Sequence, residues 1–249
     1  MSFWRHIPKW KISILGAVVL FGAIFVFLAL ERPLFPYREL LAAVGGALIG
    51  QIALFVPEID KAKERQERTK KEGITSLLLG KEIAIAALGG YNTSFTNLGF
   101  EEGKFISYCN ILGISGENIF NLIKAVIMKS NTQNDSLTNI KYIIDEIEGF
   151  LSSKDPALVS LFNIGIKAVA ILSIRMHPIY PNQPELLSEA IKYIENQKEI
   201  LNKSKYSMLW EIVIAPILKV LSSDEFTNEV DRVKALESIF DELNKQILE

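Results

Sequence analysis

Cys109 and His177 are the residues of this chain whose types could make a nucleophile and its base. A thiol beside an imidazole forms a nucleophilic pair, and both side chains also bind zinc. Cys109 is the only cysteine among the 249 residues, and the other histidine, His6, lies near the N-terminus. A structural zinc site takes four ligands at short spacing, which this pattern lacks. A lone cysteine in a helical pattern is typically a small buried apolar residue, so we expect neither a catalytic pair nor a metal site.

The most unusual polar cluster is residues 89–94, which read Gly-Gly-Tyr-Asn-Thr-Ser. Glycine-rich turns can hold phosphate with their backbone amides, but a phosphate loop also needs a wider glycine spacing and a following Lys-Ser or Lys-Thr pair. Paired glycines more often end a helix. The pattern therefore indicates a helix end followed by a loop, and we expect no bound cofactor.

Three carboxylates, Asp145, Glu146 and Glu148, lie close together in the sequence. They fall opposite an apolar stripe at helical spacing, where a charged and solvated face is expected. The residue inventory therefore favours a non-enzymatic protein. A membrane-bound enzyme acting on a lipid or a small molecule is the alternative, and no residue pattern speaks for it. The stripe consists of Ile140, Ile143, Ile144, Ile147 and Leu151.

The elements that would position these residues begin with two apolar stretches. Residues 12–30 contain no charged side chain, and residues 40–56 are interrupted only by Gln51. A helix needs about 20 apolar residues to cross a hydrocarbon core of about 30 Å. The sequence thus predicts a two-helix transmembrane hairpin in residues 1–57, in which Pro57 closes the second span and either kinks the helix at the membrane surface or starts a new one. The first stretch lacks small residues spaced for cleavage, which indicates an uncleaved anchor.

Basic residues flank both outer sides of the predicted hairpin. Lysine and arginine concentrate on the cytoplasmic side of membrane spans. We therefore expect an integral protein, of the cell membrane, with both termini in the cytoplasm. The flanking residues are Arg5, Lys9 and Lys11 before the first span and Lys61, Lys63, Arg65, Arg68, Lys70 and Lys71 after the second.

The second span carries a stripe of small residues, Ala42, Gly46 and Gly50, at intervals of four. Such a stripe lets helix backbones approach closely in lipid. One interpretation is packing against the first span of the same hairpin, and the other is a homo-oligomer formed through the second span. Gln51 adds a polar group that needs a hydrogen-bond partner, either between helices or in the lining of a pore.

Beyond the membrane, residues 58–72 are mostly charged and pair opposite charges four residues apart, which predicts a solvated helical stalk. Residues 73–249 read as consecutive helices, without the alternation that marks a strand. The fold class is therefore all-α: a hairpin, a charged stalk and a multi-helix soluble bundle. Expected helices of the bundle cover residues 74–88, 104–112, 140–151, 157–174, 185–203, 207–221 and 230–247, and one more follows Ser115 with an apolar stripe of Ile119, Leu122, Ile123, Val126 and Ile127.

Residues 157–174 form the most apolar of these helices, and Asp155 with Pro156 predicts where the helix begins. Two interpretations stay open, a central core helix of the bundle or a third membrane span. Lys167 near its middle would cost several kcal/mol in lipid, which favours the core helix.

The formal net charge of −2 does not predict a nucleic-acid partner, which would favour a basic surface. We expect the lipid bilayer and a protein to be the partners. The favoured hypothesis is a membrane-anchored protein whose cytoplasmic helical domain is a protein-interaction or scaffolding module. In the alternative hypothesis, that domain senses a ligand or a partner and is coupled to oligomerisation of the hairpin, as a pore or a signalling assembly.

Overall fold

A computed structural model describes residues 38–89, 101–129, 133–176, 184–223, 225–226 and 229–248. These residues form eight α-helices and one π-helical turn and include no strand. The predicted all-α class is therefore confirmed. The chain divides into two units, Met1–Arg68 and Thr69–Glu249, and helix α2 (Arg38–Gly89) begins in the first and ends in the second.

Helix α2 contains Pro57. Of the two outcomes predicted for Pro57, the start of a new helix does not occur, because α2 continues past this residue as far as Gly89. Pro57 has no N–H to donate to the carbonyl of Ala53, but the residues that follow are mostly Glu, Lys, Arg, Gln and Ala, which favour helix. Helix α2 reaches Gly89, the first of the paired glycines, and residues 90–100 lie outside the described residues.

The predicted hairpin falls largely outside what the structure describes. The first span, residues 12–30, lies outside the described residues, and the second, residues 40–56, lies in α2 before its side chains are described. Among the described helices, none combines the length and the apolar character that a membrane crossing requires. The charged stretch that follows is helical, and Lys61, Glu64 and Arg65 are exposed.

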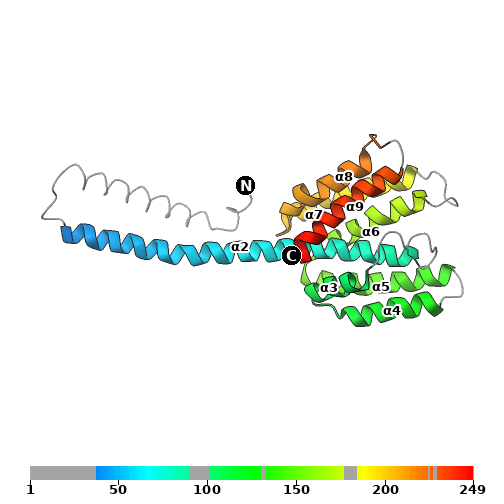
Figure 1. Cartoon of the computed structure of the whole chain (residues 1–249), viewed down its shortest axis with the longest axis horizontal. Coiled ribbons are helices and arrows are strands. Elements are labelled where there is room, and N and C mark those ends of the chain that lie inside the picture. The colour runs from blue at the N-terminus through cyan, green and yellow to red at the C-terminus, as the bar shows by residue number, and fades with distance from the viewer. Residues whose placement is uncertain are drawn as a thin grey trace. The chain divides into compact units, whose positions relative to one another are not determined.

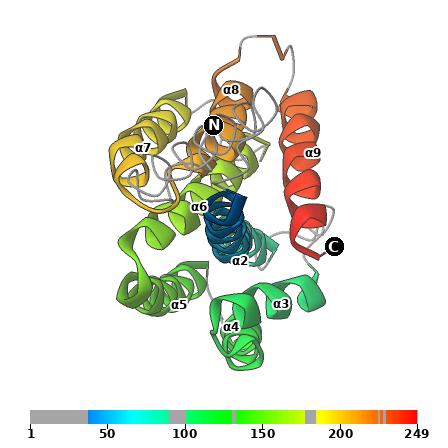
Figure 2. The ribbon, with the colours of Figure 1, turned by 90° about the vertical axis from the view of Figure 1, so that its left-hand side faces the viewer.

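In the second unit, seven α-helices and the π-helical turn accompany the C-terminal part of α2. Helices α3, α4 and α5 lie on one side of it, and α7, α8 and α9 lie on the other (Figures 1 and 2). Helix α6 packs against α5, α7 and α9. The elements are α3 (Glu102–Leu112), α4 (Gly116–Lys129), α5 (Gln133–Lys154), α6 (Pro156–Met176), α7 (Pro184–Lys203), η4 (Trp210–Ile214), α8 (Ala215–Ser222) and α9 (Glu229–Leu248).

The core of this unit is built on α2 and α6. Residues 73–80 of α2 are all buried. Helix α6 buries most of its side chains over residues 157–169, whereas Lys167 is exposed. Residues 157–169 therefore belong to the core, as predicted for a central helix. The most buried side chains of α6 are Ala157, Leu158, Leu161, Phe162, Ile164 and Ala168.

Helices α2 and α6 cross at two glycines. A Cβ atom on Gly80 would overlap the backbone carbonyl oxygen of Phe162, and one on Gly165 would overlap that of Leu77. The hydroxyl of Ser76 donates to the backbone carbonyl of Leu158 at 2.7 Å on the same interface. The two backbones thus touch without intervening side chains, and this contact fixes how α6 lies on α2.

Local signals in the sequence set where the helices begin and end. The carboxylate of Asp155 accepts from the backbone N–H of Ala157 at 2.9 Å, which confirms the predicted start of α6. Gly113 has φ of 73° after α3, a conformation that glycine adopts without strain. Pro216 cannot donate to the carbonyl of Ile212, and the π-helical turn η4 immediately precedes α8. Pro216 thus lies in the first turn of α8.

The last helix, α9, packs on its own unit. Its apolar stripe at near-heptad spacing is buried, so the stripe serves the fold of this chain. The buried members are Val233, Leu236, Phe240, Leu243 and Ile247.

Candidate functional site

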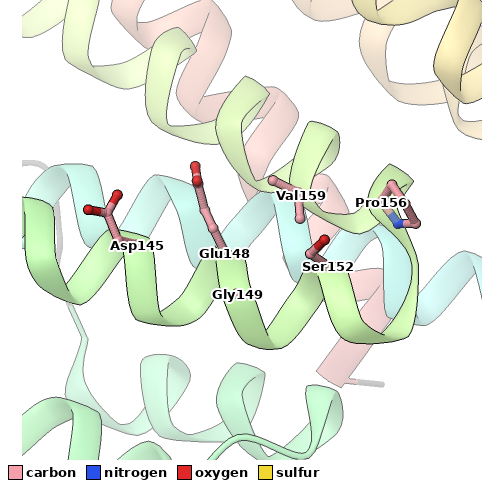
Figure 3. Close-up of a pocket in the computed structure, with 6 residues that line it drawn as sticks. All are labelled: Asp145, Glu148, Gly149, Ser152, Pro156 and Val159. Carbon is pink, nitrogen blue, oxygen red and sulfur yellow. The ribbon is translucent and has the colours of Figure 1, made fainter.

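A shallow groove lies between α5 and α6. Its volume is about 380 Å³, and it combines two carboxylates and a hydroxyl with apolar surface. Figure 3 shows Asp145, Glu148 and Ser152 rising from α5 and Val159 reaching toward them from α6. The six lining residues are Asp145, Glu148, Gly149, Ser152, Pro156 and Val159.

The groove follows from the two-sidedness of α5. Ile143, Ile147 and Leu151 are buried, so the residues on the opposite side of α5 face away from the core. Asp145 is exposed and Glu148 is partly exposed. The prediction that these carboxylates lie on the solvent side of the stripe is therefore confirmed.

Two features keep the groove open. A Cβ atom added to Gly149 would meet no other atom within 4 Å, so this position leaves free space on α5. The single residue Asp155 connects α5 to α6, and the carboxylate of Asp155 fixes the first turn of α6. The tight connection places Pro156 and Val159 at one end of the groove.

Glu148 links the groove to α6 and α7. Its Oε1 accepts from the side-chain Nδ2 of Asn163 at 2.6 Å. Burial raises the pKa of Tyr193 on α7, the charge of Glu148 raises it further, and a hydrogen bond with Asn163 lowers it. The ammonium of Lys167 lies 5.8 Å from the centre of the Tyr193 ring. Glu148 is therefore held in place by its neighbours, whereas Asp145 projects into solvent.

An exposed aromatic side chain extends this surface along α5. Tyr142 is 58% exposed, and its hydroxyl donates to Glu146 at 2.8 Å. This hydrogen bond raises the pKa of the Tyr142 hydroxyl. Carboxylates, an aromatic ring and apolar groove walls together suit the side chain of a lysine or an arginine, whose stem is apolar and whose head is cationic.

The predicted packing residues of the second span are Ala42, Gly46, Gly50 and Gln51. Their backbone belongs to α2, but their side chains lie outside those that the structure describes. Their role in helix packing or in a homo-oligomer therefore stays a prediction.

The thiol of Cys109 is fully buried on α3, and burial raises its pKa to about 12. It is therefore a protonated, apolar side chain at neutral pH, as the sequence indicates. His177 and the rest of the polar cluster, residues 90–94, lie outside the described residues. Within the described parts of the chain, no group of three or more His, Cys, Asp or Glu side chains could hold a metal ion.

Sequence reasoning finds the carboxylates of this surface but misses the groove itself. Gly149 of α5 and Val159 of α6 line the groove together, and no local pattern in the sequence gives that pairing. Comparisons of the chain with protein-family models, with curated proteins and with solved structures return no match.

Proposed function

We propose that this protein is a membrane-anchored, non-enzymatic protein whose helical domain, residues 73–249, binds another protein in the cytoplasm through the α5–α6 groove. The observation that supports this proposal is the composition of the groove. Asp145 and Glu148 supply negative charge beside the apolar surface of Pro156 and Val159. Such a surface favours a partner that inserts a lysine or an arginine side chain.

The anchor rests on the apolar stretches 12–30 and 40–56 and on the basic residues that flank them. It is tested by fractionating cells that express the full chain and washing the membranes with alkaline carbonate. The full chain is expected to stay with the membranes, and a chain lacking residues 1–56 is expected to be released. Release of the full chain would contradict the anchor.

The binding surface is tested with a photo-crosslinking residue at Ser152, in the groove, and with the same residue at Glu242, an exposed position of α9. The full chain in its own membrane is used for both. We expect a discrete crosslinked protein from position 152 and none from position 242. Asp145→Lys should abolish the crosslink, because it reverses a charge that lines the groove.

Glu195→Lys is the control for Asp145→Lys. Glu195 is an exposed carboxylate of α7, and it does not line the groove. The crosslink from position 152 is expected to persist in this variant. Equal loss in both variants would show that general charge, and not the groove, attracts the partner, and would contradict the proposal.

The second candidate function couples the domain to oligomerisation of the hairpin. It is supported by the stripe of Ala42, Gly46 and Gly50 with the nearby amide of Gln51. Replacing Gly46 and Gly50 with leucine should abolish detergent-stable oligomers of the full chain, while Val44→Leu, on the opposite side of the same helix, should leave them. Oligomers that survive the double replacement would contradict this function.

A further inference from the structure

One carboxylate lies in the core of the helical domain. The side chain of Glu82 on α2 is 1% exposed, and its Oε1 lies 3.1 Å from the ammonium of Lys81. Its other oxygen, Oε2, is buried and has no hydrogen-bond partner among the described residues. The pair is therefore incomplete, because one carboxylate oxygen has lost its water and gained no donor.

Lys81 compensates the charge only in part. Its side chain is 16% exposed, so its ammonium remains partly in water while Glu82 does not. The same ammonium lies 5.7 Å from the centre of the Phe240 ring on α9, which provides it with a second favourable contact. When the carboxylate of Glu82 is neutral, the ammonium of Lys81 therefore still has contact with water and with the Phe240 ring.

Helices α3 and α9 bring further polar groups toward this position. Lys104 of α3 and Glu101, the residue just before α3, both act on Glu82 through their charges, and they pair with each other at 2.7 Å. The hydroxyl of Tyr108 on α3 donates to Oδ1 of Asn244 on α9 at 2.6 Å. Burial raises the pKa of Tyr108 above its ordinary value, and the charges of Glu82, Glu101 and Asp241 raise it further.

Burial is the largest influence on the proton of Glu82. It raises the pKa of this carboxyl above its ordinary 4.5, against the opposing effects of Lys81 and Lys104. A buried carboxyl that is neutral avoids most of the cost of losing water, and a charged one does not. The folded domain therefore holds this proton at a pH where the unfolded chain has released it.

We propose that Glu82 is a proton-binding site that sets the stability of the helical domain: one proton taken up here strengthens the domain at lower pH, and its release weakens the domain as the pH rises. A carboxyl with a raised pKa in the folded state contributes stability that is complete below its ordinary pKa. That stability is lost as the pH rises through the folded-state pKa.

The test compares urea unfolding of the full chain in detergent at pH 5, 6, 7 and 8 for the wild type and for Glu82→Gln, followed by circular dichroism. Glutamine has the shape of the protonated carboxyl and does not titrate. The unfolding equilibrium constant of the wild type, relative to Glu82→Gln, should rise by up to about tenfold per pH unit between the unfolded and folded pKa. Identical pH profiles for the two proteins would overturn the proposal.

Glu101→Gln is the matched control, because Glu101 lies in the same cluster but its side chain is 57% exposed. Its pH profile should stay parallel to that of the wild type. A change as large as that of Glu82→Gln would assign the effect to the general charge of the cluster and would also overturn the proposal.

Lys81→Gln provides an independent variant. This variant removes the ammonium that pairs with Oε1 of Glu82. The charged carboxylate is then left without an ion-pair partner, so the loss of stability should be much larger at pH 8 than at pH 5. Combined with Glu82→Gln, the same replacement should show no pH dependence of its own. A loss from Lys81→Gln that is equal at both pH values would contradict a titrating Glu82.

Discussion

Helix α6 lies against α2 at one interface and against α5 at another. Glycine has a different role at each of these two interfaces. At the α2–α6 crossing, Gly80 and Gly165 each face a backbone carbonyl of the other helix and leave no space for a methyl group. At the α5–α6 groove, Gly149 faces open space. The same residue type therefore closes one interface and opens the other. Only the neighbour across the interface decides which of the two occurs.

The polar side chains at the crossing are buried, whereas those at the groove are exposed or partly exposed. At the crossing, the hydroxyl of Ser76 is buried and donates to the carbonyl of Leu158. At the groove, Asp145 is exposed, and Glu148 is only partly exposed and accepts from Asn163. The crossing satisfies its polar atoms internally, as a core must, whereas the groove keeps charge available to another molecule.

The largest effect is expected from alanine at the crossing. Gly165→Ala places a methyl group where the carbonyl of Leu77 lies, and neither backbone can move without separating the two helices. We expect a loss of about 3 kcal/mol or more in the free energy of unfolding, measured by urea unfolding. Gly80→Ala should act similarly, since the contact is reciprocal. A loss below about 1 kcal/mol would show that the helices are not in backbone contact.

A smaller effect is expected from the buried hydroxyl at the same crossing. Ser76→Ala removes the hydrogen bond to Leu158 and should lower the free energy of unfolding by about 1 kcal/mol. Ser153→Ala is its control, because the hydroxyl of Ser153 makes a bond of the same length, 2.7 Å, to the carbonyl of Phe150 on an exposed surface. Its effect should be close to zero. Equal effects would mean that burial does not matter at Ser76.

The first turn of α6 is expected to matter at a similar level. Asp155→Ala removes the acceptor for the N–H of Ala157 at the connection between groove and crossing, and should cost about 1 kcal/mol of stability. Asp155→Asn keeps an acceptor and should restore most of it. Thermal unfolding of the three proteins provides the measurement. If Asn is no better than Ala, the cap does not hold this turn.

The sequence predicts correctly those features that depend on contacts between residues close together in the chain. The stripe of α5, the start of α6 at Asp155 and the burial of Cys109 depend on residues within one helix, and these predictions agree with the structure. The crossing joins Gly80 to Gly165 across more than eighty residues, and a glycine inside a helix otherwise only predicts weaker helix. The charge of Glu82 is visible in the sequence, but its burial depends on contacts that no local pattern gives.

Pro57 shows why the sequence left two outcomes open, a kinked helix or a new one. A proline inside a helix removes one hydrogen bond and usually ends or bends the helix. In α2 the strong helix formers on its C-terminal side outweigh that local signal, and the helix runs to Gly89. The helix-breaking effect of the proline and the helix propensity of the residues after it oppose each other, and the sequence alone does not show which of the two prevails.

The smallest effect on stability is expected at the groove, where it separates folding from binding. Gly149→Ala meets no atom and should stabilise α5 by up to about 1 kcal/mol through its better helix propensity. Gly103→Ala on α3, also in open space, should stabilise its helix to a similar degree. Only the change at Gly149 adds atoms to the groove, so it alone should weaken the crosslink from Ser152, and Gly149→Leu should abolish it while the domain stays folded. Crosslinking that is unchanged in Gly149→Leu would place the partner elsewhere and would remove the functional half of the contrast between the two glycine contacts of α6.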